Sequence, residues 1–180
     1  MFTYGAKLVR VVDGDTVDID IDLGFGVWLK NERIRLYGID TPESRTRDKV
    51  EKKFGKAAKA FVVNFLDDPA GLTLKCKSYN SKGKYGRIMG DIYRNTDYTE
   101  KSVNEHLMEK HHAVPYYGQS KTELVEEHLA NRLYLYQSTL EGTPEVDSDT
   151  INYADIPARA LEYVESLWDH DQLDLDSDAK

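Results

Sequence analysis

Alternating apolar and polar residues predict strands in the first part of the chain. From Val17 to Leu23 every second residue is apolar and the residues between are aspartates, which is the period of a strand with one face in water. The patterns over residues 4–12 and 27–37 favour strands on either side of it. Gly24 and Gly26 indicate a bulge or tight turn before the third strand.

The middle of the chain alternates between a helix and further strands. Residues 44–52 are charged and poor in apolar groups, so we expect a loop there. Apolar residues from Phe54 to Phe65 follow helical spacing, and Pro69-Ala70-Gly71 ends the predicted helix. Two more strands are predicted over residues 72–79 and 88–93.

Two further helices begin at capping boxes, in which a serine is followed three residues later by a glutamate. The pairs are Ser102 with Glu105 and Ser120 with Glu123, and the second helix should run to about Gln137. Five short strands surround one helix, and no parallel crossover pattern repeats. We therefore expect an α+β fold, namely a five-stranded OB-fold barrel with three helices.

Residues 141–180 differ from the rest of the chain in charge. They hold 12 acidic and 2 basic residues, so residues 1–140 carry a net charge of +2 although the whole chain carries −8. We expect one globular domain over 1–140 and an acidic C-terminal extension over 141–180, with a short helix near Leu161–Trp168. The extension is either a solvated tail or a segment that binds the domain or a protein partner.

Other features narrow the class of protein. The single cysteine, Cys76, cannot form an internal disulfide and is interpreted as a buried or half-buried structural thiol. No apolar run approaches the ~20 residues of a membrane span, so no membrane partner is expected. The start, Met1–Lys7, has no apolar signal region. We therefore expect a cytoplasmic protein, or one that acts in a host cell's cytoplasm if a phage encodes it.

Carboxylates and arginines gather at the predicted strand ends. Asp13-Gly14-Asp15 lies at a turn, Asp40-Thr41-Pro42-Glu43 follows a strand, and Arg35 and Arg87 lie close to strand ends. Asp-Gly-Asp alone is common in turns, where glycine takes positive φ. The combination is more informative. Oxygen ligands for a hard cation, a spare carboxylate and two guanidinium groups are what metal-assisted hydrolysis of a phosphodiester requires.

The same motifs carry a family resemblance. Over roughly residues 5–137 the chain resembles the staphylococcal nuclease, or thermonuclease, family, whose fold is a five-stranded OB barrel with three helices. The resemblance rests on the segments Val12–Val17, Arg33–Glu43, Phe54-Gly55, Lys84–Arg87 and Val103–Glu105. It implies a Ca²⁺-dependent endonuclease that cleaves DNA and RNA with little sequence specificity and leaves 3′-phosphate ends. We expect a monomer.

The resemblance also assigns roles at the strand ends. Asp15, Asp40 and the backbone carbonyl of Thr41 resemble the ligands of one Ca²⁺ ion. Asp13 resembles the residue that supports metal-bound water. Glu43 resembles the general base, or the group that orients the attacking water.

Two arginines, Arg35 and Arg87, resemble the catalytic pair that clamps the scissile phosphate. A planar guanidinium can bind two phosphoryl oxygens while staying charged, which a lysine cannot reproduce.

Four residues are candidates for further substrate contacts: Lys84, Tyr85, Tyr117 and Lys49. Tyr85 either meets a base or phosphate or is an aromatic residue at the end of the barrel. Tyr117, with Tyr116 as a weaker candidate, is expected to stack on a base. Lys49 either meets a phosphate or is an ordinary exposed lysine.

A function of another class is left open, namely a weakly catalytic or inactive OB-type module that binds nucleic acid or protein. A pure binder has no need for an acidic metal pocket that repels phosphate, which favours the nuclease. His111 and His112 complete no metal set with their neighbours in the sequence and are interpreted as structural.

Overall fold

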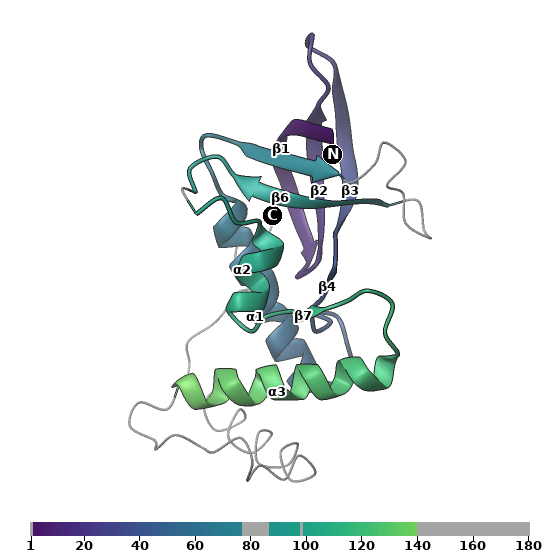
Figure 1. Cartoon of the computed structure of the whole chain (residues 1–180), viewed down its shortest axis with the longest axis vertical. Helices are drawn as coiled ribbons and strands as arrows, with labels where there is room; N and C mark the ends of the chain where they lie inside the picture. The colour runs from purple at the N-terminus through teal and green to yellow at the C-terminus, as the bar shows by residue number, and fades with distance from the viewer. Residues whose placement is uncertain (1, 77–86, 98, 140–180) are drawn as a thin grey trace. The chain divides into compact units, whose positions relative to one another are not determined.

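The computed structural model describes residues 2–76, 87–97 and 99–139 (Figure 1). The chain divides into two compact units, Met1–Asn131 and Arg132–Lys180. The fold and the site belong to the first unit, apart from residues 132–139 at the end of the last helix. Several predictions lie outside the described residues, namely the strand end at 77–79, Lys84 and Tyr85, and the acidic extension with its helix. The expected domain boundary at residue 140 stays a prediction.

The centre of the first unit is a closed barrel of five strands, as the sequence predicts (Figure 1). Neighbouring strands are antiparallel except for β3 and β6, which pair in parallel. In order around the barrel the strands are β1 (Phe2–Asp13), β2 (Thr16–Asp22), β3 (Trp28–Leu36), β6 (Ile88–Arg94) and β5 (Leu72–Cys76), which returns to β1.

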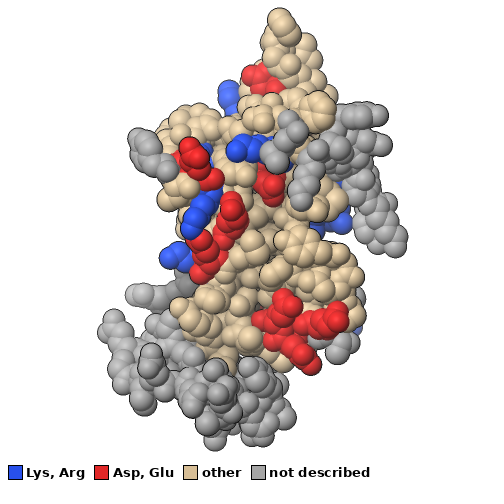
Figure 2. Space-filling model, viewed as in Figure 1, with Lys and Arg blue, Asp and Glu red and all other residues tan. Residues whose placement is uncertain are grey.

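The strand period sorts the side chains of β2 between the two faces of the barrel. Val17, Ile19 and Ile21 are buried in the hydrophobic core. The alternating aspartates lie on the outer face, where Asp18 and Asp20 form ion pairs with basic residues of β1 and β3. Glycines after β2 have positive φ, as the expected tight turn requires. Figure 2 shows basic and acidic side chains close together over the barrel.

Three helices occur in the described part of the chain: α1 (Lys49–Leu66), α2 (Val103–Glu109) and α3 (Lys121–Thr139). The expected capping boxes form, with Ser102 bonded to Glu105 and Ser120 bonded to Glu123. The prediction of a loop over 44–52 is wrong for its second half, because α1 begins at Lys49. The Asp48 carboxylate accepts hydrogen bonds from two backbone N–H groups of the first turn, so polar residues start this helix.

Two of the helices, α1 and α2, pack against the barrel through apolar side chains, and one buried amide adds hydrogen bonds. Val62 and Leu66 of α1 and Leu107 of α2 complete the core. The side chain of Asn104 in α2 donates to the Tyr37 carbonyl and to the Asp91 carboxylate, each at 2.9 Å. Because Asp91 belongs to β6 and Tyr37 directly follows β3, Asn104 ties α2 to the barrel.

A two-stranded sheet was not predicted. Asp40 of β4 (Ile39–Asp40) pairs with Val114 of β7 (Val114–Pro115). Two residues are too short to show a strand period, so the alternation pattern carries no signal for them. The pairing fixes the backbone of Asp40 against the segment that enters α3.

Cys76 is buried, as predicted, and burial raises the pKa of its thiol. Among the helices that the structure describes, none has both the length and the apolar character needed to cross a membrane.

Candidate active site

The Asp13–Asp15 turn joins β1 to β2, and Thr41 and α1 pack tightly against it. A Cβ on Gly14 would lie 2.8 Å from Thr41 Oγ1 and 2.9 Å from the Ala58 Cβ. Gly14 is not among the glycines with positive φ. The usual reason for glycine in such turns therefore does not apply. Close approach to Thr41 and to α1 requires it here.

A second glycine places the loop that carries Glu43. A Cβ on Gly55 of α1 would come within 2.5 Å of backbone atoms of Glu43 and Ser44. The helix and this loop can touch only because the side chain is absent. Asp13 Oδ1 accepts hydrogen bonds from the N–H groups of Ser44, at 3.2 Å, and Gly14, at 2.9 Å. The turn, the loop and α1 are thus held as one assembly.

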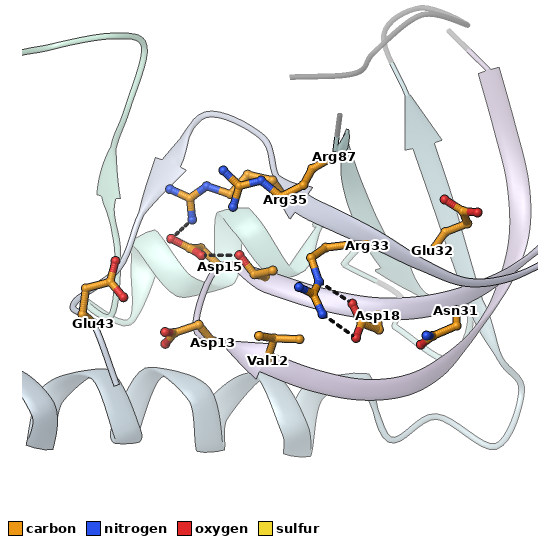
Figure 3. Close-up of a pocket in the computed structure, with 11 residues that line it drawn as sticks. Val12, Asp13, Asp15, Asp18, Asn31, Glu32, Arg33, Arg35, Glu43 and Arg87 are labelled. Carbon is orange, nitrogen blue, oxygen red and sulfur yellow. Dashed lines mark hydrogen bonds and ion pairs between the residues drawn. The ribbon is translucent and has the colours of Figure 1, made fainter. Parts of the chain in front are cut away.

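Arg35 is the centre of the site (Figure 3). It lies on β3 with its side chain 15% exposed, and its guanidinium forms ion pairs with Asp15 and, at 3.0 Å, with Asp40. It also donates to the Ile39 carbonyl at 3.2 Å, and Thr16 donates to Asp15 at 2.8 Å. Burial lowers the pKa of Arg35, although the Asp40 charge opposes that shift. The two expected ligand carboxylates therefore converge on one point.

His128 of α3 is a member of the site that the sequence reasoning missed. Its Nε2 lies 3.1 Å from Asp40 Oδ2, and the residue is 9% exposed. Burial raises the pKa of the Asp40 carboxyl, but the bond from His128 and the charge of Arg35 outweigh it, so the pKa is lowered overall. The one available signal was helical spacing, because His128 follows the equally buried Leu124 by one turn.

The site opens into a cavity of about 750 Å³ (Figure 3). Asp13, Asp15, Arg35, Glu43 and Arg87 all line it, as the shared role predicted for them requires. The Arg87 guanidinium lies beside that of Arg35 (Figure 3). Burial raises the pKa of the Glu43 carboxyl, and the negative charges of Asp13 and Asp40 act in the same direction.

The two candidate tyrosines, Tyr116 and Tyr117, line a neighbouring cavity of about 500 Å³ that shares Arg35 and Arg87 with the first. Tyr117 is 72% exposed, and its ring is 3.1 Å from the position that a Cβ on Gly38 would occupy. The structure thus places Tyr117 and Tyr116 beside the arginine pair.

Lys49, His111 and His112, which the sequence also singled out, lie outside these two cavities. Lys49 is the exposed first residue of α1 and lines neither of the two cavities. His111 is bonded to Asn131, and His112 packs against Phe61 with ring centres 5.4 Å apart. Burial lowers the pKa of His112. These contacts agree with the structural interpretation of both histidines.

The donor set suits a hard cation held by few protein ligands. Within residues 2–76, 87–97 and 99–139, no three His, Cys, Asp or Glu side chains form a metal cluster. The expected set contains only two carboxylates, Asp15 and Asp40, with a backbone carbonyl of the buried Thr41. Because both carboxylates already contact one cationic group, Arg35, their oxygens are close enough to share a cation. Oxygen donors of this kind fit Ca²⁺.

The chain is similar in sequence to several known proteins. An uncharacterised protein of Methanocaldococcus jannaschii is 31% identical over 142 residues, which are 70% of this chain and 65% of the relative. The thermonuclease of Staphylococcus intermedius is 36% identical over 84 residues, or 47% of this chain and 45% of the relative. That of Staphylococcus hyicus is 29% identical over 102 residues, or 56% of each protein.

These matches span less than two thirds of the length of each relative. The model of the family described as "Staphylococcal nuclease homologue" matches residues 33–139. That range includes Arg35, Asp40, Glu43 and Arg87, together with all three helices. With its five-stranded OB-type barrel, the chain belongs to the staphylococcal nuclease family.

Proposed function

We propose that this protein is a Ca²⁺-dependent endonuclease that hydrolyses phosphodiester bonds of DNA and RNA with little sequence specificity and leaves 3′-phosphate ends. The observation that carries the proposal is the arrangement around Arg35. Two carboxylates converge on it, Arg87 lies beside it, and Glu43 faces the same cavity.

Three residues would hold the metal: Asp15 and Asp40 through their carboxylates, and Thr41 through its backbone carbonyl. When bound there, Ca²⁺ would offset the negative charge of the phosphate and of the attacking oxygen. The chain's own contribution is to keep two acidic groups close together. Three features serve that purpose: the pairing of β4 with β7, the close packing of Thr41 and α1 against Gly14, and the hydrogen bond from His128 to Asp40.

The arginine pair accounts for recognition of the scissile phosphate. Arg35 and Arg87 place two permanent positive charges in a partly enclosed cavity, where water screens them less than at the surface. Charge that develops on phosphoryl oxygens during the attack is stabilised by donors already in position. One lost donor of this kind costs ~10²–10³ in rate.

Glu43 is the proposed base, or the group that orients the attacking water. A carboxylate with a raised pKa accepts a proton more readily than an ordinary surface glutamate. Gly55 contributes indirectly, because its missing side chain lets α1 fix the backbone of Glu43.

The cavity lined by Tyr116 and Tyr117 is the proposed binding site for a nucleobase. Tyr117 exposes most of its ring next to the arginine pair, and stacking on such a ring is worth ~1–3 kcal/mol per base with little regard to sequence. That chemistry is consistent with cleavage of many sequences.

A digestion series tests the proposal. Plasmid DNA and a single-stranded RNA are incubated with the protein in millimolar-range Ca²⁺ or in excess chelator, and the product ends are mapped by their need for phosphatase before 3′ extension. We expect cleavage in Ca²⁺ only, with 3′-phosphate ends. Full activity in chelator would remove the metal assignment, and no cleavage under any condition would remove the nuclease.

One observation favours the alternative of an inactive binding module. Arg35 pairs with both carboxylates, so its charge is largely satisfied within the protein. If that pairing persisted in the presence of Ca²⁺, the carboxylates would not be available to the metal, and Arg35 would not be available to the phosphate. The same digestion series distinguishes the two functions, because a binding module would retain DNA without cutting it.

A further inference from the structure

A second arginine–carboxylate cluster lies on the outer face of the barrel beside the proposed active site. Arg10 of β1, Asp18 of β2 and Arg33 of β3 are directly opposite one another in the strand register. Arg10 Nε is 2.7 Å from one Asp18 oxygen, and Arg33 Nε is 2.7 Å from the other. Arg33 adds a second bond, from its terminal nitrogen to Asp18, at 3.0 Å. We call these three residues the arginine rung.

Burial within the rung is uneven. The Asp18 side chain is 1% exposed, whereas the side chains of Arg10 and Arg33 are 63% and 44% exposed. The bond from Arg33 lowers the pKa of Asp18 despite burial, so the carboxylate stays charged. The anion is covered while its two cations face solvent, which leaves the rung with an excess of positive charge at the surface.

The rung also orients Arg33. Two parallel bonds to one carboxylate fix the plane of the guanidinium, which removes part of the entropy that a free surface arginine loses on binding. Asp18 by itself would cancel the charge of Arg33. Arg10 supplies the second cation, so that Arg33 can be held in place and still attract an anion.

The position of Arg33 connects the rung with the catalytic arginines. Arg33 and Asp18 line the same cavity as Arg35, Glu43 and Arg87 (Figure 3). Arg33 and Arg35 are two residues apart on β3, so they project on the same face about 7 Å apart along the strand. That step is comparable with the distance between successive phosphates in an extended single strand.

We propose that Arg33, held by Asp18 and Arg10, binds the phosphate next to the scissile one in a single-stranded nucleic acid. The inference rests on the proposed function for the position of the scissile phosphate. It adds a site for the neighbouring nucleotide, so that substrates with more than one phosphate are bound more tightly than the shortest cleavable substrate.

Lys30 provides a matched control. It lies on β3, its Nζ pairs with Asp20 at 2.7 Å, and its side chain is 67% exposed. It therefore repeats the cation–carboxylate pair of Arg33 but does not line the cavity. Lys30→Gln and Arg33→Gln remove the same charge from the same strand.

The kinetic experiment compares a dinucleotide with a longer single-stranded oligonucleotide. For Arg33→Gln we expect KM for the oligonucleotide to rise about tenfold, the effect of one lost charge-assisted contact, with kcat unchanged. KM for the dinucleotide should stay the same, because it has no second phosphate. Arg33→Lys should recover part of the loss, and Lys30→Gln should match the wild type on both substrates.

A binding experiment tests the inference without catalysis. Affinity of a fluorescent single-stranded oligonucleotide is measured in chelator across a salt series. Loss of one phosphate contact should reduce the slope of log affinity against log salt by ~0.7 for Arg33→Gln, and not for Lys30→Gln. Equal slopes and equal affinities for the two variants, with both proteins shown by thermal unfolding to be folded, would overturn the proposal. Absence of cleavage by the wild type would count against the proposed function only.

Discussion

Two clusters of arginine and aspartate lie next to each other on β3, and the ratio of arginines to carboxylates in one is the reverse of that in the other. At the proposed active site one arginine, Arg35, meets two carboxylates, Asp15 and Asp40. In the arginine rung two arginines meet one carboxylate, Asp18. The Arg35 side chain is 15% exposed and that of Arg33 is 44% exposed.

The difference shows how one strand can serve two kinds of ligand. The first cluster has a surplus of negative charge in a partly buried place, which suits a cation. The second has a surplus of positive charge at the surface, which suits an anion. Because the strand repeat brings both onto one face, a phosphate chain can meet the two clusters in succession.

The largest effect is expected from the same substitution at the two arginines. Arg35→Lys should lower kcat by ~10² or more, because a point charge cannot replace the planar fork at the scissile phosphate. Arg33→Lys should leave kcat at the wild-type level, since Arg33 meets a phosphate that does not react. Steady-state kinetics on DNA in saturating Ca²⁺ measures both. Equal losses of kcat would show that the two clusters do not have separate roles.

The next effect concerns the carboxylate that His128 holds. His128→Ala should weaken Ca²⁺ binding by roughly 10–100-fold, the usual cost of losing a partner that orients a ligand. His128→Gln should recover part of the affinity if its amide can still donate to Asp40. Calorimetric titration with Ca²⁺ in the absence of substrate measures the affinity directly.

His111→Asn is the control for that prediction. It changes a histidine that bonds to α3 through Asn131 and not to Asp40. His111 has positive φ, which asparagine tolerates. If both histidine variants lost the same Ca²⁺ affinity, the effect would come from the packing of α3 and not from the contact with Asp40.

A smaller effect is expected when Asp18 of β2 is compared with Asp15 of the turn that precedes this strand. Asp18→Asn should lower the free energy of unfolding by about 1 kcal/mol, discounted because both arginine partners remain solvated, and should leave kcat unchanged. Asp15→Asn should instead reduce Ca²⁺ affinity and activity. Urea unfolding and steady-state kinetics on the same preparations test the pair. Loss of kcat in Asp18→Asn would contradict the separation of the clusters.

The smallest effect is a pH dependence of stability outside both clusters. Burial against Phe61, together with the charge of His111, lowers the pKa of His112 below its ordinary value of 6.5. As pH falls through that ordinary value, the unfolded chain takes up a proton that the folded protein resists, so stability is lost toward lower pH. His112→Phe keeps a ring against Phe61 and should flatten the dependence between about pH 7 and pH 5.

The pH range over which stability changes distinguishes the effect of His112 from that of the carboxyl groups. Hydrogen bonds to Thr99 and the contact with His106 lower the pKa of Asp97 to about 2, so its contribution is present above its ordinary value of 3.8 and is lost only below it. An unchanged slope in His112→Phe between about pH 7 and pH 5 would mean that His112 is not neutral in the folded protein.

The barrel could be predicted because its strands repeat a local pattern. Alternation over Val17–Leu23 shows which face of β2 is buried, and the serine–glutamate pairs mark two helix starts. The start of α1 could not be placed, because charged residues there form the solvent face of a helix capped by Asp48. β4 and β7 were missed because their pairing joins Asp40 to Val114, far apart in the chain.

The sequence alone determined the chemistry available at the candidate site. Carboxylates and arginines at recognisable spacings indicate a site for a cation and a phosphate. What tertiary structure decided is which of them share a partner. Arg35 reaches Asp15 and Asp40 at once, His128 reaches Asp40 from another helix, and Arg33 joins the same cavity. Local patterns constrain backbone conformation over a few residues, whereas these contacts depend on barrel closure and helix packing.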